Sequence, residues 1–384
     1  MPGMGYFLQN YFMLFLFSAL LGQLMSSAGC ARKIALSMAH LLEYAKSDKE
    51  RRFLCLLFVP ILYFILCYIG ISGFVVVFTV LPIAKELYEK TDTPWRLYCV
   101  AGSQSISQGV LVGSLSACNI YAADVCGTST TAGVGLSLVL VGTYMAVSLA
   151  LIRITVYRLE TTGEGFLPSG AQIKTSVDLD ALPEENLPRL SFSLFPVAVL
   201  IVLSAGLHVN VVVTLAVGCL ITLIIGYKNI FPDFRNIISK GISASFGPIL
   251  CVSATYAIGN SLKQLEGFRL FEQSLTALPP LLEGVSIGVL TSFIMASAAA
   301  PVASFGEQML ERYTAAGLSV SEAHRMMTLT SFSSIAPHNA GISNAAQVLR
   351  LPYSSCIKVY MIYTYIPGFA ALLVGIICIH FGII

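Results

Sequence analysis

Charged residues are scarce in this 384-residue chain, at 11% of the sequence, against about 25% in a typical soluble domain. Hydrophobic residues make up 56%, and the mean hydropathy is +0.80. So few charges cannot cover the surface of a soluble globule of this size, which excludes a soluble fold. The chain also lacks a block basic enough to bind nucleic acid, so no nucleic-acid partner is expected.

Motifs of enzyme and redox chemistry are also missing. The ten cysteines include no Cys-x-x-Cys pair, and cysteines inside apolar stretches are usually small buried hydrophobes. No His-Glu-x-x-His motif and no nucleotide-binding loop occurs. We therefore expect a non-enzyme with neither a metal site nor an organic cofactor.

Charge-free stretches dominate the sequence. Nine windows of 22 or more residues contain no Asp, Glu, Lys or Arg and together cover about two thirds of the chain: 1–31, 53–84, 97–123, 125–152, 190–227, 241–262, 284–306, 326–349 and 359–384. A membrane-spanning helix needs roughly 20 apolar residues, and these windows do not alternate as β-barrel strands would. We therefore predict an all-α polytopic membrane protein.

One hydrophilic segment divides these windows into two groups. Residues 161–188 contain three glycines and three prolines, several acidic residues and few hydrophobic ones, a composition typical of a linker. We predict a first membrane half at 1–158, a cytoplasmic linker at 159–189 and a second membrane half at 190–384.

The two halves repeat one order of segments. Each has a span, an apolar window broken at a tip of small residues, a broken polar helix and a closing span. The tips are 70–73 and 296–301, and the helix breaks are 113–119 and 337–344. Paired interrupted segments in two halves indicate a transporter with internal symmetry. We predict inverted repeats, each with a re-entrant hairpin and a broken transmembrane helix.

The distribution of basic residues supports opposite orientations of the halves. If the first hairpin enters from the cytoplasm and the second from outside, eighteen Lys and Arg residues lie inside. Four lie outside, namely Lys263, Arg269, Arg312 and Arg325, in agreement with the positive-inside rule. We expect an integral, multi-pass protein of the plasma (inner) membrane, with the lipid bilayer around it.

The four breaks contain the candidate site residues. Broken backbone at membrane depth is tolerated where it is buried or lines a wet cavity, and half-helix N-termini favour anions. No strongly basic residue lies within the breaks, so amide dipoles and polar side chains are expected to hold an anionic substrate. The predicted substrate-binding residues are Ser72, Gly73, Gly113, Ser114, Asn119, Ser297, His338, Asn339 and Asn344.

His338 is the candidate proton-coupling group, because it follows a helix-breaking Pro337 and an imidazole titrates near physiological pH. Two alternatives stay open. Carbonyl and side-chain oxygens at the breaks would suit Na⁺ as the coupling ion. Residues 70–73 also match the Gly-x-Ser-Gly of rhomboid-type intramembrane serine proteases, in which Ser72 would be the nucleophile and His338 the base.

Four stretches carry a family resemblance: Gly70-Ile71-Ser72-Gly73-Phe74-Val75-Val76-Val77-Phe78; Gly113 to Asn119 with Gly127 to Ala132; Ser297 with its small neighbours; and His324-Arg325 with Pro337-His338-Asn339-Ala340-Gly341. Together they resemble the gluconate:proton symporter family of permeases, within the ion-transporter superfamily. The resemblance implies proton-coupled uptake of a small hydroxy-carboxylate, gluconate-like or hydroxybutyrate-like, often by a homodimer. It also implies that the first repeat is short at its N-terminus.

Overall fold

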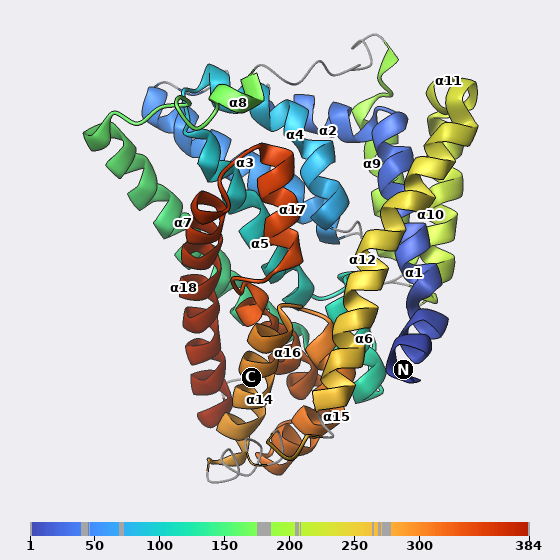
Figure 1. Ribbon diagram of the computed structural model, residues 1–384, viewed down its shortest axis with the longest axis vertical. Coiled ribbons are helices and arrows are strands. Elements are labelled where there is room, and N and C mark those ends of the chain that lie inside the picture. The colour runs from blue at the N-terminus through green and yellow to red at the C-terminus, as the bar shows by residue number, and fades with distance from the viewer. Residues whose placement is uncertain are drawn as a thin grey trace.

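The computed structural model describes residues 2–39, 45, 47–68, 73–174, 186–203, 207, 209–262, 265–267, 270 and 278–382. Figure 1 shows a bundle of helices, and these described residues contain no β-strand. Four of the described helices are long and apolar enough to cross a membrane, and one bent pair of helices could add a fifth span. The protein is an all-α polytopic membrane protein, as the charge-free windows predicted.

A pair of helices lies on either side of each predicted tip and forms a hairpin. The first consists of α3 (Asp48–Tyr68) and α4 (Gly73–Lys90), and the second of α14 (Pro280–Met295) and α15 (Ala300–Ala315). In Figure 1 the first hairpin lies in the upper part of the molecule and the second in the lower part. The two hairpins therefore lie toward opposite ends of the bundle, as an inverted repeat would place them.

Both predicted helix breaks are present. In the first half, α5 (Cys99–Val110) and α6 (Ala117–Cys126) flank the break. In the second half, α16 (Val320–Thr330) and the short 3₁₀ turn η6 (Ser331–Ser334) precede it and α17 (Ala340–Leu349) follows. In Figure 1 α5 lies above α6, whereas α16 lies below α17. The two broken helices therefore run in opposite directions through the molecule.

Local capping explains where the second segments restart. The Ser116 hydroxyl accepts a hydrogen bond from the backbone N–H of Asn119 (3.3 Å) at the start of α6. The Asn339 side-chain oxygen accepts one from the N–H of Ile342 (3.1 Å) at the start of α17. Ser and Asn are preferred caps because they satisfy N–H groups that have no partner within the helix.

The other long helices surround these units. The helix α1 (Pro2–Ser27) packs against α10 (Val211–Ile225) and α12 (Phe234–Leu262), and α7 (Val134–Thr162) packs against α18 (Tyr353–His380). Helices from the two predicted halves therefore interleave in space. The shorter elements are α2 (Cys30–Ala39), η2 (Trp95–Tyr98), α8 (Ala171–Lys174), α9 (Leu190–Ile201), α11 (Tyr227–Ile230) and η5 (Phe231–Asp233).

Candidate functional site at the two helix breaks

The tip of each hairpin is hydrogen-bonded to the break in the helix that follows it. In the first half, the N–H of Leu115 donates to the carbonyl of Tyr68 (2.9 Å), which is the last residue of α3. The Tyr68 hydroxyl donates in return to the carbonyl of Val112 (2.7 Å). These two bonds fix the end of α3 to the unwound segment between α5 and α6.

In the second half, side chains of the break make the corresponding contacts. The Asn339 amide donates to the Ala296 carbonyl at the hairpin tip (2.9 Å) and to the Ser334 carbonyl before the break (2.8 Å). His338 Nε2 lies 2.9 Å from the carbonyl oxygen of Ile294. Because a carbonyl only accepts, Nε2 carries a proton, and Nδ1 is the atom that would take up a second one.

The tip of the second hairpin contains a strained residue. Ala296 has φ 46° and ψ 37°, in the left-handed region, where a residue other than glycine pays roughly 1–2 kcal/mol. The chain turns there into α15, and the Ser297 hydroxyl accepts a hydrogen bond from the N–H of Ala300 (3.2 Å). Ser297 is half-buried, and the tip is held by its hydroxyl and by the Asn339 side chain.

Arg325 is counted among the outside cations, and the structure places it within the helix α16, away from the surface. Its side chain is fully buried and extends from α16 to the first break. Nε donates to the carbonyl of Ala132 (2.6 Å) and Nη2 to that of Thr130 (2.7 Å). Nη1 donates to Asn119 Oδ1 (2.8 Å) and to the carbonyl of Val110 (3.2 Å). The break itself contains no Lys or Arg, but the guanidinium of Arg325 reaches it from α16.

Asn119 is the centre of this buried network. Its Oδ1 lies 2.7 Å from His324 Nε2, and its amide donates to the carbonyls of Ser114 (2.8 Å) and Thr130 (3.2 Å). His324 Nδ1 lies 2.8 Å from the Thr128 hydroxyl. Asn119 and His324 are both completely buried. In this conformation their polar atoms hold the first break together and are enclosed by protein.

The predicted site residues thus fall into two groups. One group is buried in the Asn119 network, and the other lies partly exposed at the second break and the hairpin tips. The buried group is Gly113, Ser114 and Asn119, and the partly exposed group is Gly73, Ser297, His338, Asn339 and Asn344. Ser72 lies outside the described residues, so its expected approach to Ser297 stays a prediction.

Gln104 in α5 is a candidate that sequence reasoning did not select. It is 3% exposed, and neither polar atom of its side chain has a hydrogen-bond partner among the described residues. A buried polar group without a partner costs about 1–3 kcal/mol, so it generally bonds to water or a ligand. The available signal was the polar run at 102–109 inside an apolar window.

The oxygen atoms at the first break are already used by protein donors. The Thr130 carbonyl accepts from Gly113 N (2.9 Å) as well as from Asn119 and Arg325. The guanidinium lies among these oxygens as a bound cation would. Elsewhere in the described part of the chain, no group of three or more His, Cys, Asp or Glu residues could hold a metal ion.

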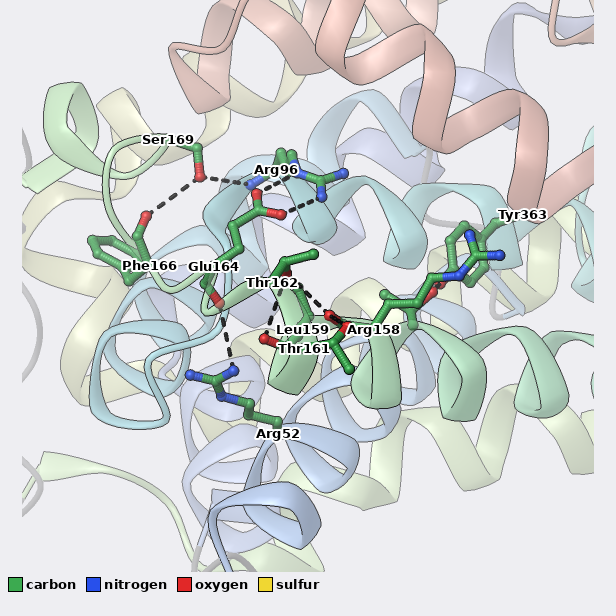
Figure 2. A network of polar contacts seen from close by, with 11 residues as sticks. Arg52, Arg96, Arg158, Leu159, Thr161, Thr162, Glu164, Phe166, Ser169 and Tyr363 are labelled. Carbon is green, nitrogen blue, oxygen red and sulfur yellow. Dashed lines mark hydrogen bonds and ion pairs between the residues drawn. The ribbon is translucent and has the colours of Figure 1, made fainter.

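Part of the predicted linker packs against the base of the first hairpin (Figure 2). Glu164 accepts hydrogen bonds from Arg96 Nε (2.7 Å) and Nη2 (2.6 Å). These bonds lower the pKa of the Glu164 carboxyl and raise the pKa of Arg96. Arg52 donates to the Glu164 carbonyl (3.4 Å) and to the Asp92 carboxylate (3.0 Å). The start of the linker is therefore an ordered part of the structure.

Phe166 carries this segment into the core. It is 3% exposed, its ring centre lies 6.0 Å from that of Trp95, and its N–H donates to Asp92 (2.8 Å). The Trp95 indole donates in turn to the carbonyl of Leu349 (3.0 Å), the last residue of α17. A Cβ at Gly165 would collide with Asp92. The linker therefore connects the first hairpin with the second broken helix.

Comparison with known proteins agrees with the expected class. No family model matches the chain. It is similar to the uncharacterized transporter YxjC of Bacillus subtilis (strain 168), with 22% identity over 398 residues, 92% of this chain and 83% of the relative. It is also similar to the crystal structure of the YdaH transporter of Alcanivorax borkumensis, which was described as having an unusual topology. That alignment has a TM-score of 0.46 and 13% identity over 99% of this chain and 88% of the other.

YxjC carries the name of a transporter. The relative found by sequence thus agrees with a membrane transporter in place of a membrane-embedded enzyme. The narrower resemblance to gluconate permeases stays a prediction, as do the substrate and the coupling ion.

Proposed function

We propose that this protein is a secondary active transporter that couples proton entry to the uptake of a small hydroxy-carboxylate, gluconate-like or hydroxybutyrate-like, across the plasma (inner) membrane. The observation that carries the choice of an anion is the buried guanidinium of Arg325 at the first break. Among the described residues it forms no ion pair with a carboxylate. Neutral carbonyl and amide oxygens solvate the guanidinium without neutralising its charge, which supports a site of positive potential.

Helix termini supply a positive potential at the second break. The helices α15 and α17 both begin at the second break and its hairpin tip, and the bond from Asn339 to the Ala296 carbonyl joins them there. The N-terminus of a helix carries a partial positive charge and free N–H donors. An anion near Ser297 and His338 would meet two such termini, in surroundings where charges are screened less than in water.

His338 is the proposed proton carrier. The imidazole is exposed at the second break, and its Nε2 proton is engaged by the Ile294 carbonyl. Protonation of Nδ1 would create a cation beside the substrate without breaking that bond, and loss of the proton would release the attraction. This geometry supports a coupling role, because one group would respond to both proton and carboxylate.

Sodium coupling is the second candidate, and the first break disfavours it. A Na⁺ site there would need four oxygen atoms, and all four accept hydrogen bonds from Arg325. They are the Asn119 side-chain oxygen and the carbonyl oxygens of Val110, Thr130 and Ala132. A sodium ion would have to displace a fixed cation. The protease alternative depends on Ser72, and labelling of that serine by a fluorophosphonate probe would favour it.

Uptake into proteoliposomes tests the proposal. Radiolabelled gluconate, 3-hydroxybutyrate, lactate and glycerate would be offered under an inward proton gradient, an inward sodium gradient or no gradient. We expect accumulation of at least one of these acids only under the proton gradient. The His338→Gln variant should lose the pH dependence, whereas His380→Gln, at the end of α18, should behave as wild type.

Two outcomes would contradict the proposal. Accumulation driven by sodium alone would assign the coupling ion to the alternative. Uptake by His338→Gln with an unchanged pH profile would remove His338 from the coupling step and leave it as a hydrogen-bonding residue of the site. Cross-linking of the purified protein would test the expected homodimer separately.

A further inference from the structure

A groove on the outer side of α9 and α10 has an apolar part and a polar part. The polar part, of about 400 Å³, includes Lys228 and Asn229 and shares two residues, Ile224 and Ile225, with the apolar part. The apolar part has about 330 Å³ and is lined by Ser191, Phe192, Phe195, Ile221, Ile224 and Ile225. Because the two cavities share lining residues, they form one amphipathic groove.

The polar part lies at a level where the chain has the features of a membrane interface. The helix direction changes by 84° between α10 and the segment that follows it. Tyr227 and Phe231, just beyond the bend, are 60% and 69% exposed with ring centres 5.6 Å apart. Exposed aromatic residues gather at the headgroup level of a bilayer. Figure 1 shows this bend at one end of the bundle, at its outer edge.

The floor of the polar part is fixed by packing and hydrogen bonds. The Asn229 amide donates to the carbonyl of Asn186 (3.0 Å) and to that of Ala28 (3.2 Å), next to the end of α1. Gly226 lies so close to α1 that an added Cβ would collide with Ala28. The groove is therefore formed before a ligand arrives, and a preformed site loses less conformational entropy on binding.

Two cations lie at the polar end. Lys228 lines the groove, and Arg189 is the residue that precedes α9 at the same end of the helix pair. Both are exposed, and neither belongs to an ion pair among the described residues. We propose that the groove binds an anionic phospholipid, with an acyl chain beside Phe195 and Ile224 and the phosphate beside Lys228.

A second copy of the chain fits the groove less well. A two-fold contact buries the same surface on both partners, so Lys228 and Arg189 of both copies would bring four cations into one interface. A phospholipid complements both parts of the groove, because its phosphate neutralises the cations and its chain covers the apolar lining. The chemistry is that of the basic clefts between helices that hold lipid headgroups.

Native mass spectrometry of the full chain tests this site. The protein would be purified from an equal mixture of phosphatidylglycerol and phosphatidylcholine, and the retained lipids counted. Wild type should retain phosphatidylglycerol in preference. Lys228→Glu should reduce that preference by about five-fold or more. Ile224→Trp should reduce retention of both lipids by filling the groove, and because Ile224 is 77% exposed, the fold should tolerate the change.

The matched control is Arg235→Glu, which makes the same change of charge on an exposed residue at the start of α12, outside the groove lining. It should leave lipid retention unchanged. Equal loss of phosphatidylglycerol in Arg235→Glu and Lys228→Glu would show diffuse surface attraction and overturn the site. A lipid-free dimer that Ile224→Trp dissociates would also overturn it, and would assign the groove to a second copy.

Discussion

Replacement of Asn119 by alanine should destabilise the protein more than replacement of Arg325 by methionine, although Arg325 carries the charge. The reason lies in which atoms each change leaves without a partner. A buried donor or acceptor that loses its only partner costs far more than one that keeps another. The two variants differ mainly in this respect, because both side chains are completely buried in one network.

Arg325→Met removes four hydrogen bonds but leaves few orphaned atoms. The Val110 carbonyl keeps the Ser137 hydroxyl (2.8 Å), and the Thr130 carbonyl keeps its other donors. Only the Ala132 carbonyl loses the one side-chain donor seen for it in the described structure. One orphaned carbonyl costs about 1–3 kcal/mol, and the burial penalty of the guanidinium disappears at the same time. The net loss should therefore stay near or below that range.

Asn119→Ala leaves the cation in place with one acceptor fewer. A hydrogen bond to a charged group contributes about 1.5–3 kcal/mol, and the Ser114 carbonyl loses the Asn119 amide, for another about 1–3 kcal/mol. His324 also loses its contact at Nε2. The two costs add to about 2.5–6 kcal/mol. A double variant should be less destabilised than the two single changes added together, because alanine at 119 then faces no guanidinium.

Thermal unfolding in detergent, followed by the fluorescence of Trp95, measures this order directly, since Trp95 is the single tryptophan of the chain and is fully buried. The unfolding midpoint should be highest for wild type, lower for Arg325→Met and lowest for Asn119→Ala. A midpoint for Arg325→Met below that of Asn119→Ala would refute the prediction that unpaired polar atoms decide the loss of stability. It would mean that the charge itself contributes net stability at the break.

Three further changes test other parts of the structure. Ala296→Gly should stabilise the protein by up to about 1 kcal/mol, because relief of left-handed strain exceeds the entropy cost of glycine, and a lower unfolding midpoint would contradict this. Gln104→Leu should raise the midpoint by removing an unpaired amide while reducing uptake, and unchanged uptake would exclude Gln104 from the site. The contact with Arg96 lowers the pKa of Glu164. The stability it contributes is therefore present above the ordinary pKa of 4.5 and is lost as the pH falls below 4.5. Because the pair is about one-third exposed, this contribution should be at most about 1 kcal/mol. Glu164→Gln should abolish that pH-dependent part of the midpoint, and equal acid sensitivity in both proteins would contradict the assignment.

The order of helices could be predicted because its signals are local. A charge-free window of sufficient length predicts a span, and small or polar residues at 113–119 and 337–344 predict that a helix stops there. The helix α5 ends at Val110, before the first break, and α17 begins at Ala340, at the second break. Both positions lie within a few residues of those expectations. Opposite entry of the two hairpins is an assumption that the count of Lys and Arg supports, and that count also requires no knowledge of contacts.

The Arg325 contact could not be predicted in this way. Arg325 and Asn119 are 206 residues apart, and an arginine near the end of a helical segment has the same local pattern whether it faces solvent or the core. The packing of the linker could not be predicted for a related reason. Its glycines and prolines indicate a solvated connection. Phe166, which packs on Trp95, is one of a few scattered apolar residues in a hydrophilic stretch and carries too weak a signal.

The two breaks share one hydrogen-bond arrangement and differ in the cation that lies beside them. Each has an asparagine whose amide donates to the carbonyl of a serine five residues earlier, Asn119 to Ser114 and Asn339 to Ser334. At the first break the nearby cation is permanent, because a guanidinium does not lose its proton in a protein. At the second break the imidazole of His338 becomes a cation only when it binds a proton. Under the proposed mechanism, one proton therefore enters with each monocarboxylate and the transported charge is zero. Uptake should then follow the proton gradient and ignore a membrane potential set by valinomycin and potassium, and a strong dependence on that potential would require a second coupled charge.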